Sequence, residues 1–433
     1  LLLCFLFACS FSHAANHVVV ANQSIQAAID GAASGDVIIL TYPGEYTEHL
    51  AIAGKSLRLT STNPDQTIVL GNLAISNLPA NGKVTLDAFT LSGNINATGA
   101  GIVSLRNFTV AIGGNVIPNV ETNGTSGLYL KSSTVEGTVT VHSKQDSLGN
   151  DAKLVVLQSD VREKLVSKAA RSWIGYSTME QTYFEGLVEI VGNDFDGRDG
   201  GGIGIDLNGT TTTAAIHNNR IHHYKLDASH DITEECIGIR VAGGANADVI
   251  NNLIHDCYDG KHNGLETNCG MGIFVESTSS TKILGNAIWI CYVWDSTPAG
   301  DCPVWAPFEN VLLKNNYLLK GYGHANSEAK GGVQSVDNVH DNTNTTTPLK
   351  FVGGDPYDYH LQADSPLKNT GPVEAFYNDR DGTRNDMGMY GGHNFIPDGR
   401  TTTKPIPIRL NTAPIFVPAG GVITIQSTGA TVK

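Results

Sequence analysis

The stretches Ile216-His-Asn-Asn-Arg-Ile221 and Val249-Ile-Asn-Asn-Leu-Ile254 share one six-residue frame. The frame reads apolar, any residue, polar, Asn or Ser, any residue, apolar. It recurs along the middle of the chain at nearly regular intervals, and its other copies are Leu130-Lys-Ser-Ser-Thr-Val135, Val156-Leu-Gln-Ser-Asp-Val161, Ile190-Val-Gly-Asn-Asp-Phe195, Ile283-Leu-Gly-Asn-Ala-Ile288 and Leu313-Lys-Asn-Asn-Tyr-Leu318. A second frame travels with it at a constant spacing: Gly204-Ile-Asp-Leu207, Gly238-Ile-Arg-Val241 and Gly272-Ile-Phe-Val275. Self-similarity at such a period predicts stacked units that are each too thin to bury an apolar face alone. Short β-type runs with Asn at a corner, and no helical period between them, predict a parallel β-helix.

The fourth position of the frame, Asn or Ser, predicts how successive coils are joined. Asn tolerates the backbone conformation that a tight corner needs. Its side-chain amide can also hydrogen-bond to the equivalent amide one coil away. We therefore expect the recurring Asn side chains to stack along one corner of the solenoid.

Both ends of the chain carry a resemblance to a known superfamily. Ser24-Ile-Gln-Ala-Ala-Ile-Asp30, Gly35-Asp-Val-Ile-Ile-Leu40 and Pro43-Gly-Glu-Tyr-Thr47 resemble the opening of the pectate-lyase-like right-handed β-helix proteins. Pro348-Leu-Lys-Phe-Val352, Tyr359-His-Leu-Gln-Ala-Asp-Ser-Pro366 and the run from Asp379 to Gly391 resemble the closing segment of secreted bacterial β-helix proteins. The resemblance implies an all-β, right-handed parallel β-helix solenoid with an N-terminal capping helix over roughly residues 17 to 395. It leaves the activity open, because that superfamily holds lyases, hydrolases, epimerases and proteins without known catalysis.

The repeat spacing and the composition divide the chain into consecutive segments. Residues 1–15 are typical of a signal peptide, with an apolar run and a small-residue cleavage site near Ala14. A lipoprotein interpretation of Leu6-Phe-Ala-Cys9 stays open, although Phe7 fits it poorly. We expect a cap and first coils over 16–80, further coils over 81–345 with long loops at 222–308, a closing segment over 346–400, and a small Pro-spaced β tail over 401–433. The tail is expected to act as a strand pair packed on the last coil, or as an attachment segment. The protein is expected to be secreted, periplasmic or at the cell surface, with no transmembrane segment.

The composition limits the classes of partner. Charged residues make up 16% of the chain and glycines number 48, which is the balance of a turn-rich β protein. The formal net charge of −14 argues against nucleic acid, because phosphate binding needs a basic face. An acidic surface also repels polyuronates, so such a polysaccharide would need a local basic patch or bridging cations. A capped solenoid has no evident need for a partner chain, so we expect a monomer.

The cysteines that follow the first segment are compatible with disulfides, because export permits them. Aligning the frames places Cys257 beside Cys291 and Cys269 beside Cys302 on adjacent coils, at a separation close to that of a disulfide. We expect two such bridges with Cys236 outside both. A Cys236–Cys269 bridge competes at the same offset.

Alternation along a strand predicts which side chains leave the core. In the strand after the Asn corner, Phe195, Ile221, Ile254 and Ile288 are expected to point inward. Their successors are then expected to point outward in one column over successive coils: Asp196, His222, His255 and Trp289. In the second frame, Asp206, Arg240 and Phe274 are expected to stack outward in the same way.

Each of these columns admits two interpretations. Asp196, His222 and His255 suit a divalent metal or an acid–base relay, but the pattern favours an ordinary His–Asp hydrogen bond in an exposed ladder. Asp206 and Arg240 suit a lyase arginine beside a calcium carboxylate, but the pattern favours a surface ion pair between adjacent strands.

Long insertions follow the corner strand in three consecutive coils, and loops of this length are typically functional or disordered. The acidic loop 227–235 offers oxygen ligands for Ca²⁺, or is a solvated charged loop, and its candidate ligands are Asp227, Asp231, Glu234 and Glu235. Aromatic side chains from the insertions suit stacking on sugar rings, or cover a seam between loop and coil. The substrate-binding candidates are Tyr258, Trp289, Tyr292 and Trp294.

These patterns favour a carbohydrate-active protein that binds an extended polysaccharide across the loops of residues 222–308. The reaction that we expect is a calcium-dependent lyase elimination on a uronate-containing polymer. Lys225 or His255 would be the base and Arg240 would neutralise the substrate carboxylate, with His222 as a further catalytic candidate. The paired-Asp pattern of polygalacturonase-type hydrolases is absent from the sequence, which disfavours that class. The alternative is a non-catalytic surface or adhesion protein that binds glycans through the same loops.

Overall fold

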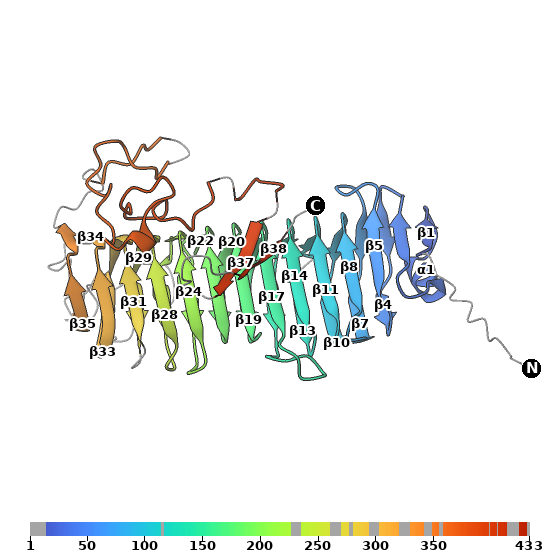
Figure 1. The fold of residues 1–433 in the computed structure, drawn as a ribbon. Coiled ribbons are helices and arrows are strands. Elements are labelled where there is room, and N and C mark those ends of the chain that lie inside the picture. Colours follow the sequence, from blue (N-terminus) through green and yellow to red (C-terminus); the bar gives the residue numbers. More distant parts are fainter. Residues whose placement is uncertain are drawn as a thin grey trace, which may run out of the picture.

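The structure is a computed structural model. It describes residues 14–113, 117–226, 235–259, 270–276, 280–293, 303–319, 330–341, 349–354, 358–397, 399–404, 406–413 and 424–430. Within these ranges 36 strands form one continuous set of parallel ladders, in which each strand pairs with its counterpart one coil later. The solenoid runs from α1 and β1 at one end to β33 and β35 at the other (Figure 1). The predicted parallel β-helix is therefore confirmed.

Each coil contributes strands to three stacks, named here by their order after the N-terminal helix. The first stack contains β1 Asn16–Val19, β2 Val37–Leu40, β5 Leu57–Ser61, β8 Lys83–Asp87, β11 Ile102–Arg106, β14 Gly127–Lys131, β17 Lys153–Leu157, β19 Arg171–Gly175, β21 Leu187–Val191, β24 Thr213–His217, β28 Asn246–Ile250, β31 Thr281–Leu284, β33 Val304–Lys314 and β35 Lys330–Val336.

The second stack carries the Asn corner at its beginning. It contains β3 Glu45–Thr47, β6 Ile68–Leu70, β9 Thr90–Ser92, β12 Thr109–Ala111, β15 Thr134–Val135, β18 Asp160–Ser167, β20 Thr178–Phe184, β22 Asp194–Asp196, β25 Arg220–His222, β26 Lys225–Leu226, β29 Leu253–Asp259, β32 Ala287–Val293, β34 Tyr317–Leu319 and β36 Val339–Asp341.

The third stack contains β4 Leu50–Ala53, β7 Leu73–Leu78, β10 Ile95–Gly99, β13 Asn119–Asn123, β16 Thr138–Val141, β23 Gly202–Leu207, β27 Cys236–Val241 and β30 Gly270–Val275. Four strands turn a corner and serve two stacks. β18 and β20 continue from the second stack into the third, while β33 and β35 serve the third and the first.

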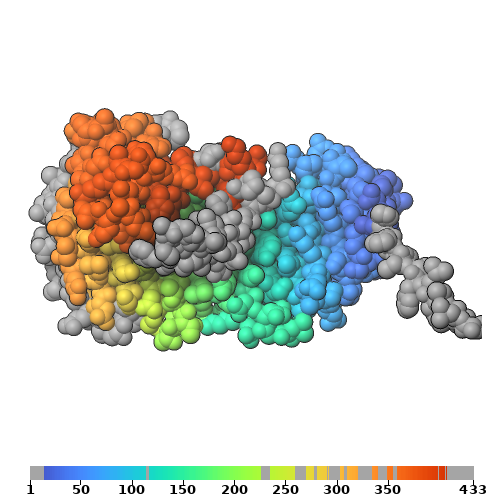
Figure 2. Space-filling view, viewed as in Figure 1, coloured from blue at the N-terminus to red at the C-terminus, as the bar shows by residue number. Residues whose placement is uncertain are grey.

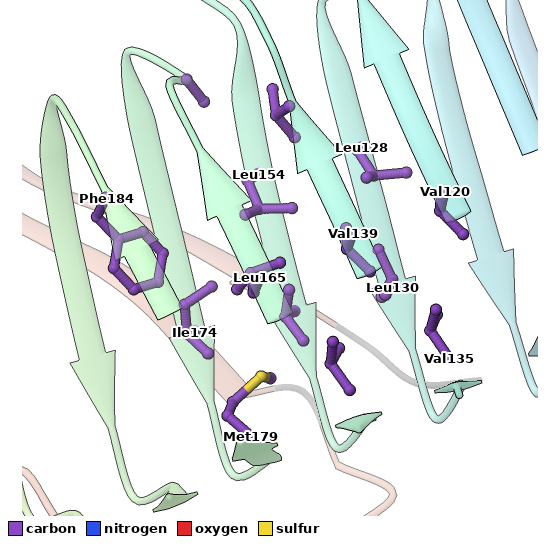
Figure 3. Close-up of a cluster of buried hydrophobic side chains, with 14 of the residues drawn as sticks. Val120, Leu128, Leu130, Val135, Val139, Leu154, Leu165, Ile174, Met179 and Phe184 are labelled. Atoms are coloured by element: carbon purple, nitrogen blue, oxygen red, sulfur yellow. The ribbon is translucent and has the colours of Figure 1, made fainter. Parts of the chain in front are cut away.

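The core is a column of aliphatic and aromatic side chains that point inward from all three stacks. Figure 3 shows part of it, with Leu128, Leu154 and Ile174 of the first stack, Met179 of the second and Phe184 of the third. The predicted inward residues Phe195, Ile221, Ile254 and Ile288 are all fully buried. Each coil thus buries its apolar face against its neighbours, as the repeat period predicts.

The Asn corner is a continuous hydrogen-bonded ladder, as predicted. The Nδ2 of Asn219 donates to the Oδ1 of Asn252 over 2.9 Å, and the Nδ2 of Asn252 donates to the Oδ1 of Asn286 over 3.0 Å. The same contact joins the further members Asn193, Asn316 and Asn338, and serine takes the position in earlier coils at Ser133, Ser159 and Ser177.

The residue that adopts the unusual backbone conformation at the corner lies one position earlier than expected. The third position of the frame adopts a left-handed conformation, with φ of +57° at Asn218 and +54° at Asn251. The fourth position instead supplies the ladder amide. Adjacent Asn residues therefore serve two separate needs, which explains why Asn-Asn recurs in the sequence.

The structure contains one coil that the six-residue frames did not predict. Ile174-Gly-Tyr-Ser-Thr-Met179 occupies the corner between β19 and β20, with Ser177 as its ladder residue. The apparent single coil between the frames at Val156 and Ile190 is therefore two short coils. They are short because β18 and β20 run through the next corner without a loop.

The N-terminal cap is a helix, α1, over Ile25–Gly31. The side chain of Ser24 accepts a hydrogen bond from the amide of Ala27, which satisfies one of the amides left unpaired at a helix start. Ile25 and Ile29 are fully buried against the first coils. The apolar stripe predicted for this helix thus covers the open end of the stack.

The segment after β36 folds back over the solenoid. It contains the short 3₁₀ helix η2 Ala375–Tyr377 and an antiparallel pair, β37 Ile406–Ala413 with β38 Thr424–Ala430. Figure 2 shows residues of the closing segment lying over the later coils. No helix among the described residues is long and apolar enough to span a membrane.

The tail packs in a different place from the one expected. Ile406 contacts a cluster on the middle coils that includes Val155, Trp173 and Val191, from β17, β19 and β21. Gln158 donates from Nε2 to the carbonyls of Gly399 and Thr402 over 2.7 and 2.9 Å. The expectation that the strand pair packs on the last coil is therefore wrong, because the closing segment carries the chain back along the solenoid first (Figure 1).

The predicted cysteine register is confirmed, but the predicted bridge is not present. Cys257 and Cys291 are aligned on β29 and β32, buried, and both are free thiols. Their Sγ atoms lie 3.6 and 3.3 Å from the carbonyl oxygens of His255 and Trp289, within reach of hydrogen bonds along their own strands. Cys269 and Cys302 lie outside the described residues.

Candidate functional site

The outward face of the second stack carries two parallel columns of side chains. One column contains Thr178, Asp194, Arg220, Leu253 and Ala287 in register. The other is the predicted column of Asp196, His222, His255 and Trp289. The alignment of these four residues over successive coils is therefore confirmed.

Charged groups pair tightly at the centre of the two columns. The guanidinium of Arg220 donates to both carboxylate oxygens of Asp194 over 2.7 and 2.8 Å. The Nε2 of His222 lies 2.9 Å from the Oδ1 of the same carboxylate. Burial opposes the charge on Asp194, but the hydrogen bond from His222 and the charge of Arg220 outweigh it and hold the pKa of Asp194 below its usual range.

The later part of the column is not the exposed ladder that the sequence allowed. His222, His255 and Trp289 are only 2%, 3% and 3% exposed. The rings of His222 and His255 stack with centroids 5.1 Å apart, and those of His255 and Trp289 stack at 4.7 Å. Tyr359 of the closing segment lies over His255, 5.4 Å away. The column points away from the solenoid core, as predicted, but the closing segment covers it.

This cover corrects the role expected for Trp289. Its ring lies 5.4 Å from Phe351 and belongs to a buried cluster with Leu349, Met387 and Met389. A ring packed on both faces presents no surface to a sugar. Trp289 therefore covers the seam between coil and closing segment. Trp294 lies outside the described residues, as does the side chain of Tyr292, and Tyr258 lies beneath the ammonium of Lys225 at 5.9 Å.

His255 has the surroundings of a neutral, enclosed imidazole. Its Nδ1 lies 2.8 Å from a carboxylate oxygen of Asp256, and among the described residues its Nε2 has no hydrogen-bond partner. Burial lowers the pKa of His255 to about 4, although Asp256 acts in the opposite direction. A base must reach the proton that it abstracts, and Tyr359 separates this ring from solvent. A catalytic role for His255 stays a prediction that would require the closing segment to move.

The other two catalytic candidates are held in ion pairs. The ammonium of Lys225 lies 3.0 Å from Asp199, and this contact raises the pKa of Lys225 although burial lowers it. Arg240 donates to both oxygens of Asp206 over 3.0 and 2.9 Å and to Glu235 over 3.0 Å. The geometry between β23 and β27 is thus the inter-strand ion pair that the sequence allowed.

The predicted calcium ligands fall almost entirely outside the described residues, which exclude Asp227, Asp231 and Glu234. Glu235 is described, and its Oε2 contacts Arg240. A different set of metal-ligating atoms does converge: one atom each from Asp196, His222 and His223, all within 4.8 Å of one another. The predicted third member, His255, is replaced by His223.

A polar groove lies beside the charged centre, under the chain that leads to the tail. It has a volume of about 320 Å³ and is lined by Ser132, Ser133, Thr134, Gln158, Ser159, Asp160, Tyr176, Thr178 and Arg400. The floor is the early part of the second stack, where Thr134, Asp160 and Thr178 are in register. Arg400 keeps exposed surface and its guanidinium donates to the carbonyl of Gly192 over 3.3 Å, while partial burial lowers its pKa.

Glu180 lies beyond the residues that line this groove and has an unusual acidity. It follows Thr178 on β20 at the next outward position. Burial raises the pKa of Glu180 to about 7, although Arg198 lies 3.5 Å away and opposes the shift. Nearby carboxylates of Glu163, Asp196 and Asp160 raise the pKa further. A carboxyl group with this pKa can hold or release a proton at neutral pH.

Several of these groups were not selected from the sequence alone. Asp194 and Arg220 occupy the same position of successive frames and carry opposite charges. This pattern could have predicted an ion pair between adjacent coils. Glu180 follows the corner that the six-residue frames did not predict. Arg400 lies far along the chain from Thr178, beyond β36, so no local pattern connects it with the groove.

The sequence matches no protein-family model and no curated protein. Solved structures of similar fold include a pectate lyase, with 14% identity and a TM-score of 0.36, over 89% of this chain and 98% of that one. They also include an alginate lyase of family PL6, with 13% identity and a TM-score of 0.33, over 75% of this chain and 51% of that one. A mannuronic-acid-specific family 6 polysaccharide lyase from human gut microbiota shows 10% identity and a TM-score of 0.28, over 75% of this chain and 83% of that one.

The chain thus spans about half the length of the PL6 alginate lyase that it matches. At these identities and TM-scores the likeness carries no argument about activity. The fold itself rests on the strand register described above, and that register confirms the parallel β-helix that the superfamily resemblance implied.

Proposed function

We propose that this chain is an exported carbohydrate-active protein that binds a uronate-containing polysaccharide in the polar groove beside Arg400 and cleaves it by elimination. The observation that carries the proposal is the hydroxyl-lined groove with Arg400 in its wall, beside which Glu180 lies one outward position beyond the lining residue Thr178. The groove replaces the loops of residues 222–308 as the proposed binding surface.

Each part of the groove has a counterpart in the chemistry of a polyuronate. Serine and threonine hydroxyls donate to and accept from sugar hydroxyls. The guanidinium of Arg400 suits a substrate carboxylate, since arginine binds carboxylates through paired N–H groups.

Elimination requires a base at the carbon next to the uronate carboxylate and a cationic group that stabilises the developing charge. In this proposal the ionised form of Glu180 takes the C5 proton and Arg400 faces the carboxylate. The C4–C5 double bond forms as the C4–O glycosidic bond breaks, and the leaving oxygen takes a proton from water. The raised pKa of Glu180 supports its assignment as the base, because a base works best when its pKa is near the operating pH. Calcium dependence through the loop 227–235 stays part of the proposal. To bind Ca²⁺, the carboxylate of Glu235 would have to give up its contact with Arg240.

The second candidate is glycan binding without cleavage, as expected of an adhesion protein. It is favoured by one observation: Lys225 and Arg240 are each engaged by carboxylates and present no unpaired cation to a substrate. Both candidate functions use the same groove, and only the first includes cleavage of the polysaccharide.

The test incubates the purified protein with a panel of uronate polysaccharides, with and without Ca²⁺, and follows the absorbance of unsaturated products. Glu180→Gln should retain binding and lose turnover. Arg400→Ala should weaken binding, whereas Arg380→Ala, at an exposed arginine elsewhere on the closing segment, should not. Binding without turnover on every polymer would support the second candidate. Equal binding by the Arg400 and Arg380 variants would remove the groove as the binding surface.

A further inference from the structure

The side chains of His222 and His223 meet at a backbone corner that brings two neighbouring residues to the same side. Successive residues of a strand point to opposite faces. His223, however, follows β25 with φ of +59°, a left-handed conformation that is uncommon outside glycine. This turn places the two imidazole rings edge to face with centroids 4.4 Å apart. Uncommon backbone geometry of this kind concentrates at functional sites.

Three ligand atoms converge at this corner. The Nδ1 atoms of His222 and His223 are 2.9 Å apart. The Oδ1 of Asp196 lies 3.2 Å from the Nδ1 of His223 and 3.8 Å from the Nδ1 of His222. Two ligands that are each about 2.1 Å from one ion, at angles of about 90–110°, lie about 3.0–3.4 Å apart. The three distances bracket that range, so small rotations of the side chains would give a common centre.

A hydrogen bond on the far side of the ring orients His222 so that its Nδ1 faces Asp196 and His223. Its Nε2 lies 2.9 Å from Asp194, which also accepts two hydrogen bonds from Arg220. An ionised carboxylate accepts the Nε2 proton, so the Nδ1 of His222 presents its lone pair to the corner. A carboxylate that orients a histidine in this way is the usual outer partner of a metal-binding imidazole. Stacking on His255 fixes the plane of the ring.

We propose that Asp196, His222 and His223 form a binding site for a divalent transition metal of the Zn²⁺ class. Two imidazole nitrogens and one carboxylate suit such an ion, whereas Ca²⁺ and Mg²⁺ prefer oxygen ligands throughout. The proposal therefore separates this centre from the calcium site expected in the loop 227–235. It holds whether or not the groove cleaves a polysaccharide.

The centre opens toward solvent on one side. The side chains of His223 and Asp196 are 40% and 33% exposed, while His222 is enclosed. Three protein ligands with an accessible side leave a coordination position for water or a substrate oxygen. The site also lies next to Glu180, whose pKa responds to the charge of Asp196.

The test uses the full chain after dialysis against a chelator. We expect calorimetric titration with Zn²⁺ to show one site, and Co²⁺ to give visible absorption bands from the same site. His223→Ala and Asp196→Asn, both at partly exposed side chains, should each weaken Zn²⁺ binding by at least about tenfold. His142→Ala is the control, because His142 is an exposed histidine that also faces a carboxylate, at 3.6 Å from Glu121.

Circular dichroism would establish that each variant is folded. An excess of Ca²⁺ should not displace Co²⁺ from this site. The proposal is overturned if the wild-type protein takes up no stoichiometric Zn²⁺. It is also overturned if His223→Ala and Asp196→Asn bind Zn²⁺ as tightly as His142→Ala, which would leave the three side chains as a hydrogen-bonded group without an ion.

Discussion

Replacing Asn252 by alanine removes one rung from the middle of the Asn ladder. Its Oδ1 accepts from both the backbone amide and the side-chain amide of Asn219, over 3.0 and 2.9 Å. Its Nδ2 donates to Asn286 and to the carbonyl of Ile216. All of these groups are buried, so no solvent is available to replace the lost contacts.

The magnitude follows from the groups that lose a partner. Two donors of Asn219 lose their acceptor in Asn252. A buried polar group left unsatisfied costs about 1–3 kcal/mol, so Asn252→Ala should lower the free energy of unfolding by about 2–6 kcal/mol. The matched control is Asn72→Ala, where an exposed Asn accepts a single inter-coil hydrogen bond from the amide of Asn94 over 2.9 Å. There water can take over, and the loss should stay below about 1 kcal/mol.

The assay is equilibrium urea unfolding of the two variants and the wild-type protein, followed by circular dichroism and tryptophan fluorescence. Solenoids can unfold in steps, so the fluorescence transition is the one to compare, because Trp173, Trp289 and Trp305 lie in coils on both sides of the rung. If Asn252→Ala and Asn72→Ala were equally stable within about 0.5 kcal/mol, the ladder would not be a source of stability and the reasoning would fail.

Three further outcomes are expected. Trp289→Ala should lower the free energy of unfolding by about 3–5 kcal/mol in a thermal or urea assay without sugar, because the ring is fully packed; unchanged stability with lost glycan binding would instead restore the sugar-stacking role. Alkylation in denaturant without reductant should label both Cys257 and Cys291, and a cross-linked peptide pair would contradict the free thiols. The raised pKa of Glu180 means that the folded state keeps a proton which the unfolded state releases between pH 4.5 and about 7, so stability should fall as the pH rises through that window. Glu180→Gln should show a smaller fall than the wild-type protein, and identical pH profiles would place the pKa of Glu180 near its ordinary value.

The repeat made the fold predictable, because the same physical requirement appears once in every coil. Asn252 and Ile254 could each be assigned a direction from the frame alone, and the structure agrees. The frame at Ile174 is hard to recognise because Tyr176 occupies its polar position and Met179 closes it. One missed coil was enough to hide Glu180 from the list of outward residues.

The candidate site was harder to predict because part of it is made by the returning chain. Alternation places His255 on the outer face of the second stack, and it does lie there. Whether an outer residue meets water or another segment depends on where residues 349–400 fold back, and no periodicity encodes that path. Arg400 and Tyr359 therefore became part of the site only in three dimensions.

The path of the returning chain has a consequence for the order in which the molecule assembles. Contacts between coils join residues one turn of the solenoid apart, and such short separations can form progressively from any starting coil. The contacts of Gln158 with Gly399 and Thr402 span 241 and 244 residues. Closing so long a loop is entropically unfavourable until both surfaces that the segment touches already exist. We therefore expect the groove wall that Arg400 provides to form after the coils, so that the proposed binding surface is completed late in folding.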